Sequence, residues 1–140
     1  KSVILETKMH KPVLSFNFRQ HTEVTMEFES NATIVYTPIN TLHTAENLAE
    51  LALSKRYAIC VNIIRQAVAM YIWEGEIKKT QECLIIFKTL PSHTASLCEL
   101  IRLHHPYTVP AILTIPAKAN AVFEKHMYKY LVSNPESLEL

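Results

Sequence analysis

The chain has 140 residues, a formal net charge of +1 and 49% hydrophobic residues. This length suits one domain with its own core, and the composition is that of a globular protein rather than a disordered tail. The lysines and arginines are scattered without a dense run, and no apolar stretch reaches the ~18 to 20 residues of a membrane span. We therefore expect a soluble chain whose partners are neither nucleic acid nor membrane.

The cysteines and the N-terminus bear on the compartment. The chain has three cysteines, Cys60, Cys83 and Cys98. An odd number without any CxxC spacing argues against a disulfide framework or a thiolate zinc site. The first residues also lack the basic and then apolar pattern of a signal peptide. A reducing, cytoplasmic location is the expectation.

Residues 1–32 differ from the rest of the chain. Alternating apolar side chains predict two strands, with Leu14, Phe16 and Phe18 in the first and Val24, Met26 and Phe28 in the second. We interpret residues 1–32 as an N-terminal extension that forms a β-hairpin.

A strand and a helix follow the extension. Residues 34–36 are a short apolar strand, and Ala45, Leu48, Ala49 and Ala52 then recur with helical spacing. Thr41 or Thr44 can cap this helix through its hydroxyl.

Residues 59–89 form the longest β-rich segment and are interrupted only by Glu74-Gly75, which contains the single glycine of the chain. The segment predicts a hairpin with Gly75 at the turn, and the phase of the alternation changes near Arg65-Gln66, which indicates a β-bulge. Glutamate is strained at positive φ, so a type I turn with a glycine bulge is favoured over type I′.

The last third of the chain predicts helix, strand and helix. Pro91-Ser92 open a helix that Pro106 ends, residues 109–115 form a strand, and Asn120 can cap a final helix. The order is βαββαβ plus a C-terminal helix, an α+β ferredoxin-like sandwich over residues 33–134 with a tail at 135–140.

The hairpin is long for a domain of this size. About 13 residues on each side of Gly75 give arms of about 43 Å, whereas a domain of about 100 residues is about 34 Å across. The hairpin should overhang its domain, and an exposed ribbon needs a partner strand, which favours an oligomer built by strand pairing. Alternatively, the bulge near Arg65 could fold the ribbon back as a corner.

Several short motifs resemble the CutA family of divalent-cation tolerance proteins. They are AICVNII at 58–64, YIWEG at 71–75, FKT at 87–89 and HHPYTVP at 104–110, and the match runs from about residue 33 to 131. The resemblance implies a PII-like homotrimer with interlocking hairpins, a cytoplasmic location, a link to copper and other divalent cations, and no established enzyme activity.

The resemblance also implies metal ligands. Family members proposed to bind copper look as though they use a cysteine at the end of the first strand, the first histidine of HHPY and a glutamate after the VP pair. These positions are Thr37 or its neighbour Tyr36, then His104, then Ala111. Only His104 keeps a ligand, with Cys60 as a further candidate, so the copper site is incomplete. The alternatives are that His104 satisfies carbonyls at the helix C-terminus and that Cys60 is an inert buried thiol.

A second candidate site combines Trp73, Lys88, His105 and Tyr107, which the resemblance places near clefts between subunits. A lysine with aromatic neighbours could hold a small anionic ligand, as in a PII-like regulatory scaffold. The alternative is that Trp73 and Tyr107 pack in an interface and Lys88 is a solvated strand end.

Catalysis has little support in the sequence. The chain contains no aspartate, and no glutamate pairs with a histidine in a triad or carboxylate-dyad pattern. We expect a non-enzymatic, trimeric divalent-cation tolerance protein, with the regulatory scaffold as the alternative.

Overall fold

The computed structural model describes residues 29–133. The strands expected at 14–18 and 24–28, and the expected tail at 135–140, lie outside the described residues. The division of the chain at residues 32 and 134 therefore stays a prediction.

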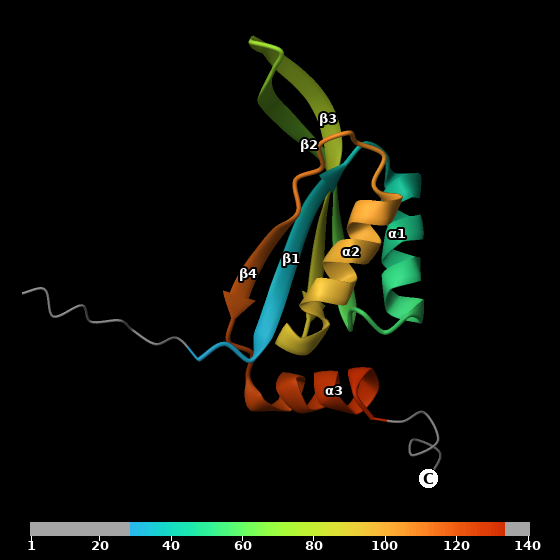
Figure 1. Ribbon diagram of the computed structural model, residues 1–140, viewed down its shortest axis with the longest axis vertical. Helices are drawn as coiled ribbons and strands as arrows, with labels where there is room; N and C mark the ends of the chain where they lie inside the picture. The colour runs from blue at the N-terminus through green and yellow to red at the C-terminus, as the bar shows by residue number, and fades with distance from the viewer. Residues whose placement is uncertain (1–28, 134–140) are drawn as a thin grey trace, which may run out of the picture.

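The described elements follow the predicted order. They are β1 (Ala32–Ile39), α1 (Leu42–Ser54), β2 (Cys60–Trp73), β3 (Glu76–Thr89), the 3-10 turn η1 (Pro91–His93), α2 (Thr94–His104), β4 (Leu113–Ala117) and α3 (Ala121–Leu131). The four strands form one antiparallel sheet in the order β2-β3-β1-β4. Helices α1 and α2 lie side by side on one face, and α3 lies below the lower end of the sheet (Figure 1). The predicted ferredoxin-like α+β fold is confirmed.

The main core lies between the sheet and the two helices. It is formed by every second residue of the strands and by the apolar stripes of α1 and α2. Among its members are Val35, Ile39, Ile85, Phe87, Leu48, Ala52, Leu97 and Ile101. Thr41 caps α1 by accepting a hydrogen bond from the Thr44 amide at 3.1 Å. Among the described helices, none is long and apolar enough to cross a membrane.

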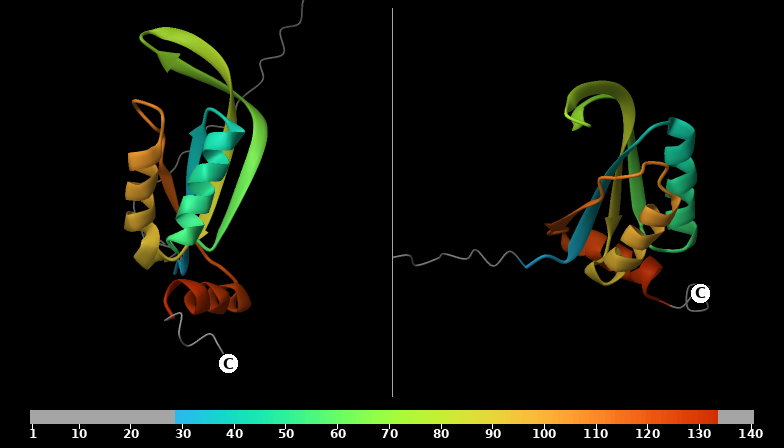
Figure 2. Two further views of the ribbon diagram at one scale, coloured as in Figure 1. Left: turned by 90° about the vertical axis from the view of Figure 1, so that its right-hand side faces the viewer. Right: turned by 45° about the horizontal axis from the view of Figure 1, so that its top comes forward.

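A two-stranded arm extends beyond this body. The pairing of β3 with β1 stops at Cys83, whereas the pairing of β3 with β2 continues to Trp73 and Glu76. Residues 67–73 and 76–82 therefore form an arm without a third strand, and they project above the body and curve over at the end (Figure 2). The predicted overhang is confirmed, at about 23 Å for seven residues.

The bulge is where the sequence indicates it. The β2–β3 register shifts between Ile64 and Ala67, and Gln66 adopts a φ of 60°. Pairing resumes beyond the shift, so the bulge does not fold the ribbon back onto the domain.

The turn differs from the expectation. Glu74 and Gly75 have φ of 51° and 79°, and Trp73 pairs directly with Glu76. Two central residues with positive φ make a type I′ turn, so the predicted type I turn with a glycine bulge is wrong. The twist of the flanking strands outweighs the strain at Glu74 because the type I′ geometry matches it.

Candidate functional site

The predicted site residues fall into three separate places along the sheet. Trp73 lies at the tip of the arm, and Lys88 lies at the other end of β3, opposite Cys60. Lys88 lies twelve positions along β3 from Glu76, the partner of Trp73, which corresponds to about 40 Å of strand. Within one chain, Trp73 and Lys88 therefore cannot line one pocket.

Cys60 and Lys88 form a cross-strand pair at the base of the hairpin. The Lys88 amine donates a hydrogen bond to the Cys60 thiol across 3.7 Å between Nζ and Sγ. Lys88 faces Ile34 on β1, whereas the HHPY segment contacts β1 four residues further along, at Pro38. Cys60 and the histidines of that segment are therefore not convergent in one chain.

The HHPY segment forms a hydrogen-bonded cluster at the base of the arm. The His105 imidazole bonds the Pro38 carbonyl through Nε2 at 2.9 Å, and its Nδ1 accepts the Tyr107 amide at 3.2 Å. The Tyr107 hydroxyl donates to the Glu82 carboxylate at 3.0 Å, and the rings of His105 and Tyr107 meet edge to face at 4.8 Å. We call His105, Tyr107 and Glu82 the arm-base cluster.

Burial shifts the pKa of two members of this cluster, His105 and Tyr107. It lowers the pKa of His105, although the Pro38 carbonyl and the Glu82 carboxylate partly offset the shift. Burial, followed by the hydrogen bond to Glu82, raises the pKa of Tyr107 to about 12. At neutral pH Tyr107 is therefore a neutral hydrogen-bond donor.

Glu82 is the member of this cluster that sequence reasoning missed. Its side chain is 8% exposed, at the last arm position of β3 and opposite Ala67, where the bulge ends. A glutamate in a polar strand segment carries no signal of burial. The adjacent bulge was the one usable hint, because bulges re-aim side chains.

The positions that the resemblance gives to copper converge only in part. Thr37 is fully buried, and its hydroxyl donates to the Ala111 carbonyl at 2.7 Å, so the first and third positions are in contact. His104 is the last residue of α2 and is exposed, whereas Leu97, Leu100 and Ile101 of the same helix are buried. No group of three potential metal ligands exists among residues 29–133. The residues present do not fit a copper site within one chain.

Comparisons with known proteins agree with the fold. The sequence model of the CutA1 divalent ion tolerance protein family matches residues 33–129. The divalent-cation tolerance protein CutA of Yersinia pestis is 34% identical over 89 residues, which cover 64% of this chain and 75% of that protein.

Solved structures give the same result. The divalent ion tolerance protein CutA1 of Ehrlichia chaffeensis superposes with a TM-score of 0.71 at 30% identity, covering 75% of this chain and 99% of that chain. The periplasmic divalent cation tolerance protein CutA of Archaeoglobus fulgidus gives 0.69 at 29% identity, covering 71% and 98%. The sequence relative and the two solved structures are thus all divalent-cation tolerance proteins.

Proposed function

Because this chain belongs to the CutA1 divalent ion tolerance protein family, we propose that it acts in divalent-cation tolerance as a non-enzymatic homotrimer. The proposal depends on one observation above all, which is that the sheet has an apolar face without helices.

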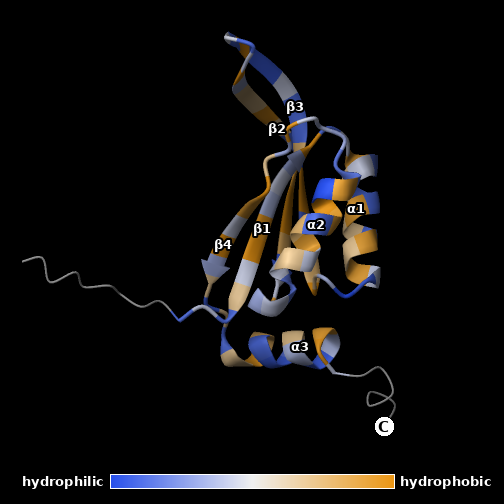
Figure 3. Ribbon diagram, in the orientation of Figure 1, coloured by the Kyte–Doolittle hydropathy of each residue, from blue (hydrophilic) through white to orange (hydrophobic). Residues whose placement is uncertain are grey.

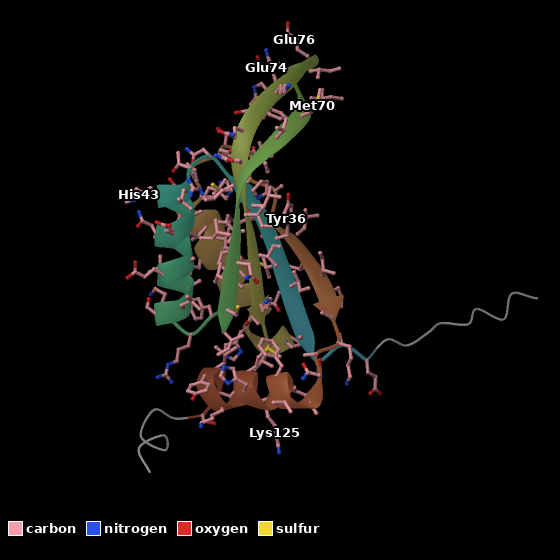
Figure 4. All side chains as sticks on the ribbon, turned by 180° about the vertical axis from the view of Figure 1, so that it is seen from behind. Tyr36, His43, Met70, Glu74, Glu76 and Lys125 are labelled. Atoms are coloured by element: carbon pink, nitrogen blue, oxygen red, sulfur yellow. The ribbon has the colours of Figure 1, made fainter. Side chains whose placement is uncertain are left out.

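The face of the sheet opposite α1 and α2, on which Tyr36 lies (Figure 4), is mostly apolar, although Asn62 and Lys88 also lie on it. The register places on it the cross-strand neighbours Ile34, Tyr36, Pro38, Ile64, Leu84, Ile86, Leu113 and Ile115. Three of these side chains are about half exposed: Ile64 at 48%, Leu113 at 52% and Ile115 at 49%. Contiguous apolar patches of this kind mark interaction sites, and homotrimer formation would bury this one.

The arm supports the same assembly. Its β2 strand is apolar and its β3 strand is mostly polar (Figure 3). Val68, Met70 and Ile72 are 63%, 67% and 77% exposed on β2, which is an edge strand of the sheet. An apolar edge strand is a template for pairing with another chain.

The two edges of the sheet, β2 and β4, are unlike each other. Pairing of unlike edges between identical subunits is heterologous, and it gives a closed ring when the rotation closes. A ring of three is the assembly that the family resemblance implies.

Light scattering after gel filtration tests the assembly. We expect about three times the chain mass of 16.0 kDa. A mass of one chain would overturn the proposed homotrimer.

Copper is the divalent cation to test first, although one chain provides an incomplete ligand set. The Thr37 hydroxyl and the Ala111 carbonyl are hydrogen-bonded to each other. Of the three positions, only His104 then offers a metal-binding side chain, an exposed imidazole. One imidazole binds copper weakly because it offers no chelate. We propose that the link to metal tolerance does not require a tight copper site within the chain.

Calorimetric titration with copper tests this step. We expect weak binding that decreases in His104→Ala and is unchanged in His43→Ala, which removes another exposed histidine. Tight, stoichiometric binding by the parent chain, or equal binding by His104→Ala, would contradict it.

Two further parts of the proposal rest on the sequence and the arm-base cluster. Glu82, a buried carboxylate, accepts a hydrogen bond from Tyr107, which is a structural use and not that of a general base. Three free thiols suit a reducing compartment, so we propose a cytoplasmic location.

A further inference from the structure

The C-terminal ends of α1 and α3 approach each other below the sheet (Figure 1). Residues at these two ends line two adjoining hollows. The first measures about 380 Å³, and its polar lining includes Lys55, Arg56, Tyr57 and His93. The second measures about 340 Å³ and is lined mainly by apolar and aromatic side chains. Arg56 and Leu131 line both, so the two hollows are continuous.

The first hollow is basic. Lys55 and Arg56 supply two cations, and among residues 29–133 no lining residue carries a carboxylate. The ion pairs within residues 29–133 are Lys78–Glu76 and Arg102–Glu99, and neither involves the hollow. Two neighbouring cations without a carboxylate attract an anion, and guanidinium groups suit phosphate because they bind two oxygens at once.

Arg56 has a strained backbone. Its φ is 58°, a conformation in which glycine usually follows the end of a helix. Hydrogen bonds hold the turn, from the Arg56 amide to the Leu53 carbonyl at 3.0 Å and from the Tyr57 amide to the Ala52 carbonyl at 2.9 Å. A non-glycine residue here costs about 1 kcal/mol, so an arginine in this place points to a use for its side chain.

His93 is a fixed wall of the first hollow. Its Nε2 bonds the Leu131 carbonyl at 3.2 Å, and its Nδ1 bonds the Ser92 hydroxyl at 2.8 Å. With both ring nitrogens occupied, His93 ties α3 to η1 and gives the hollow a rigid side. Thr89 holds Tyr57, another lining residue, by donating a hydrogen bond to its carbonyl at 2.7 Å.

The second hollow suits a flat, weakly polar group. The rings of Tyr130 and His126 pack against each other with centroids 4.7 Å apart, and the Lys129 Nζ lies 5.2 Å from the Tyr130 centroid. Leu53 and Ile59 complete the apolar lining. Arg56 stands between the two hollows, where its planar guanidinium can stack on a ring and bind an anion.

We propose that these hollows bind a small phosphorylated molecule with a flat ring, with its phosphate at Lys55 and Arg56 and its ring against Tyr130. The site differs from the arm-base cluster and from the positions assigned to copper. The site lies at the lower end of the sheet, beside α3, and not on the apolar face of the sheet. Binding there therefore does not depend on the proposed homotrimer.

Calorimetry on the full chain with 5′-AMP as the probe tests the site. We expect saturable binding of 5′-AMP that is clearly tighter than that of inorganic phosphate or adenosine, since each of these fills one hollow only. No binding of 5′-AMP at millimolar concentration would overturn the proposal. Equal affinity for adenosine would overturn the role of Lys55 and Arg56, and equal affinity for phosphate would overturn the role of the second hollow.

Arg56→Gly separates binding from folding. It removes the guanidinium and relieves the strained φ, so we expect a higher melting temperature together with at least about tenfold weaker binding of 5′-AMP. Lys125→Ala is the matched control because Lys125 points away from the body below α3 (Figure 4), and it should leave binding unchanged. Unchanged binding in Arg56→Gly, or an equal loss in Lys125→Ala, would contradict the site.

Discussion

The Thr37 hydroxyl donates a hydrogen bond to the Ala111 carbonyl at 2.7 Å, although the residues are 74 positions apart in the chain. These are two of the positions that the family resemblance associates with copper. The fold brings them together, but a hydroxyl and a methyl group replace the thiolate and the carboxylate. The geometry of the site is therefore partly kept while its chemistry is lost.

Restoring the ligands should restore the metal site. Thr37→Cys/Ala111→Glu would place a thiol and a carboxyl group on two residues that already contact each other through the Ala111 carbonyl. We expect copper affinity to rise at least about tenfold over the parent chain, because soft thiolate ligands select copper. Calorimetric titration measures the gain. The control Thr37→Ser/Ala111→Gln keeps similar sizes without the ligands, and an equal gain there would contradict the prediction.

The arm should matter for assembly more than for the folding of one chain. Val68 and Ile72 are 63% and 77% exposed on β2, so lysine at both positions costs little in a single subunit. In an assembly that buries the arm, two unpaired charges would be costly. For Val68→Lys/Ile72→Lys we expect the mass from light scattering to fall toward 16.0 kDa with an unchanged circular dichroism spectrum.

The other strand of the arm provides the control for this variant. Thr80→Lys adds a positive charge on β3, opposite Ala69, where the arm is already polar. It should leave the mass unchanged. If the β2 variant keeps the mass of the parent chain, the β2 strand is not part of the interface.

The order of the elements could be predicted because each element has a clear period. Alternating residues indicated the hairpin, the spacing of Ala45 to Ala52 indicated α1, and the change of phase located the bulge at Arg65-Gln66. These signals are local, so they can be recognised in the sequence without knowledge of tertiary contacts.

The missed features depend on tertiary structure. The fourth strand was expected from Val109, but β4 begins at Leu113, since Pro110 cannot donate to a ladder and the pairing of β4 with β1 ends at Tyr36. Arg56 and His93 line one hollow together with Leu131 of α3, and no spacing in the sequence relates the three residues. The positive φ of Glu74 likewise follows from the pairing of the two strands.

The type I′ turn makes opposite predictions for its two residues. Gly75 has a φ of 79°, and no atom lies within 4 Å of the position that a Cβ would take, so Gly75→Val introduces backbone strain without a steric clash. We expect a loss of about 2 kcal/mol in the free energy of unfolding. Glu74→Asn should instead raise the free energy of unfolding, because Asn-Gly is the preferred type I′ pair. Urea denaturation measures both, and a stabilising Gly75→Val would contradict the turn assignment.

The hydrogen bond from Tyr107 to Glu82 predicts an alkaline transition. The pKa of Tyr107 is raised to about 12 in the folded chain, against an ordinary value of 10.0. The folded state therefore keeps its proton to higher pH than the unfolded state does, and the stabilisation is complete below pH 10 and lost as the pH rises toward 12. The free energy of unfolding should fall over this interval.

Replacement of the hydroxyl isolates this contribution. Tyr107→Phe leaves the buried Glu82 carboxylate without its donor, so we expect a loss of about 1 kcal/mol at neutral pH. Above pH 10 the difference from the parent chain should shrink, because the parent then loses the same contact. Tyr128→Phe is the control, since Tyr128 is 49% exposed on α3. A parent and a Tyr107→Phe variant that lose stability in parallel between pH 10 and 12 would show that Tyr107 is not the group responsible.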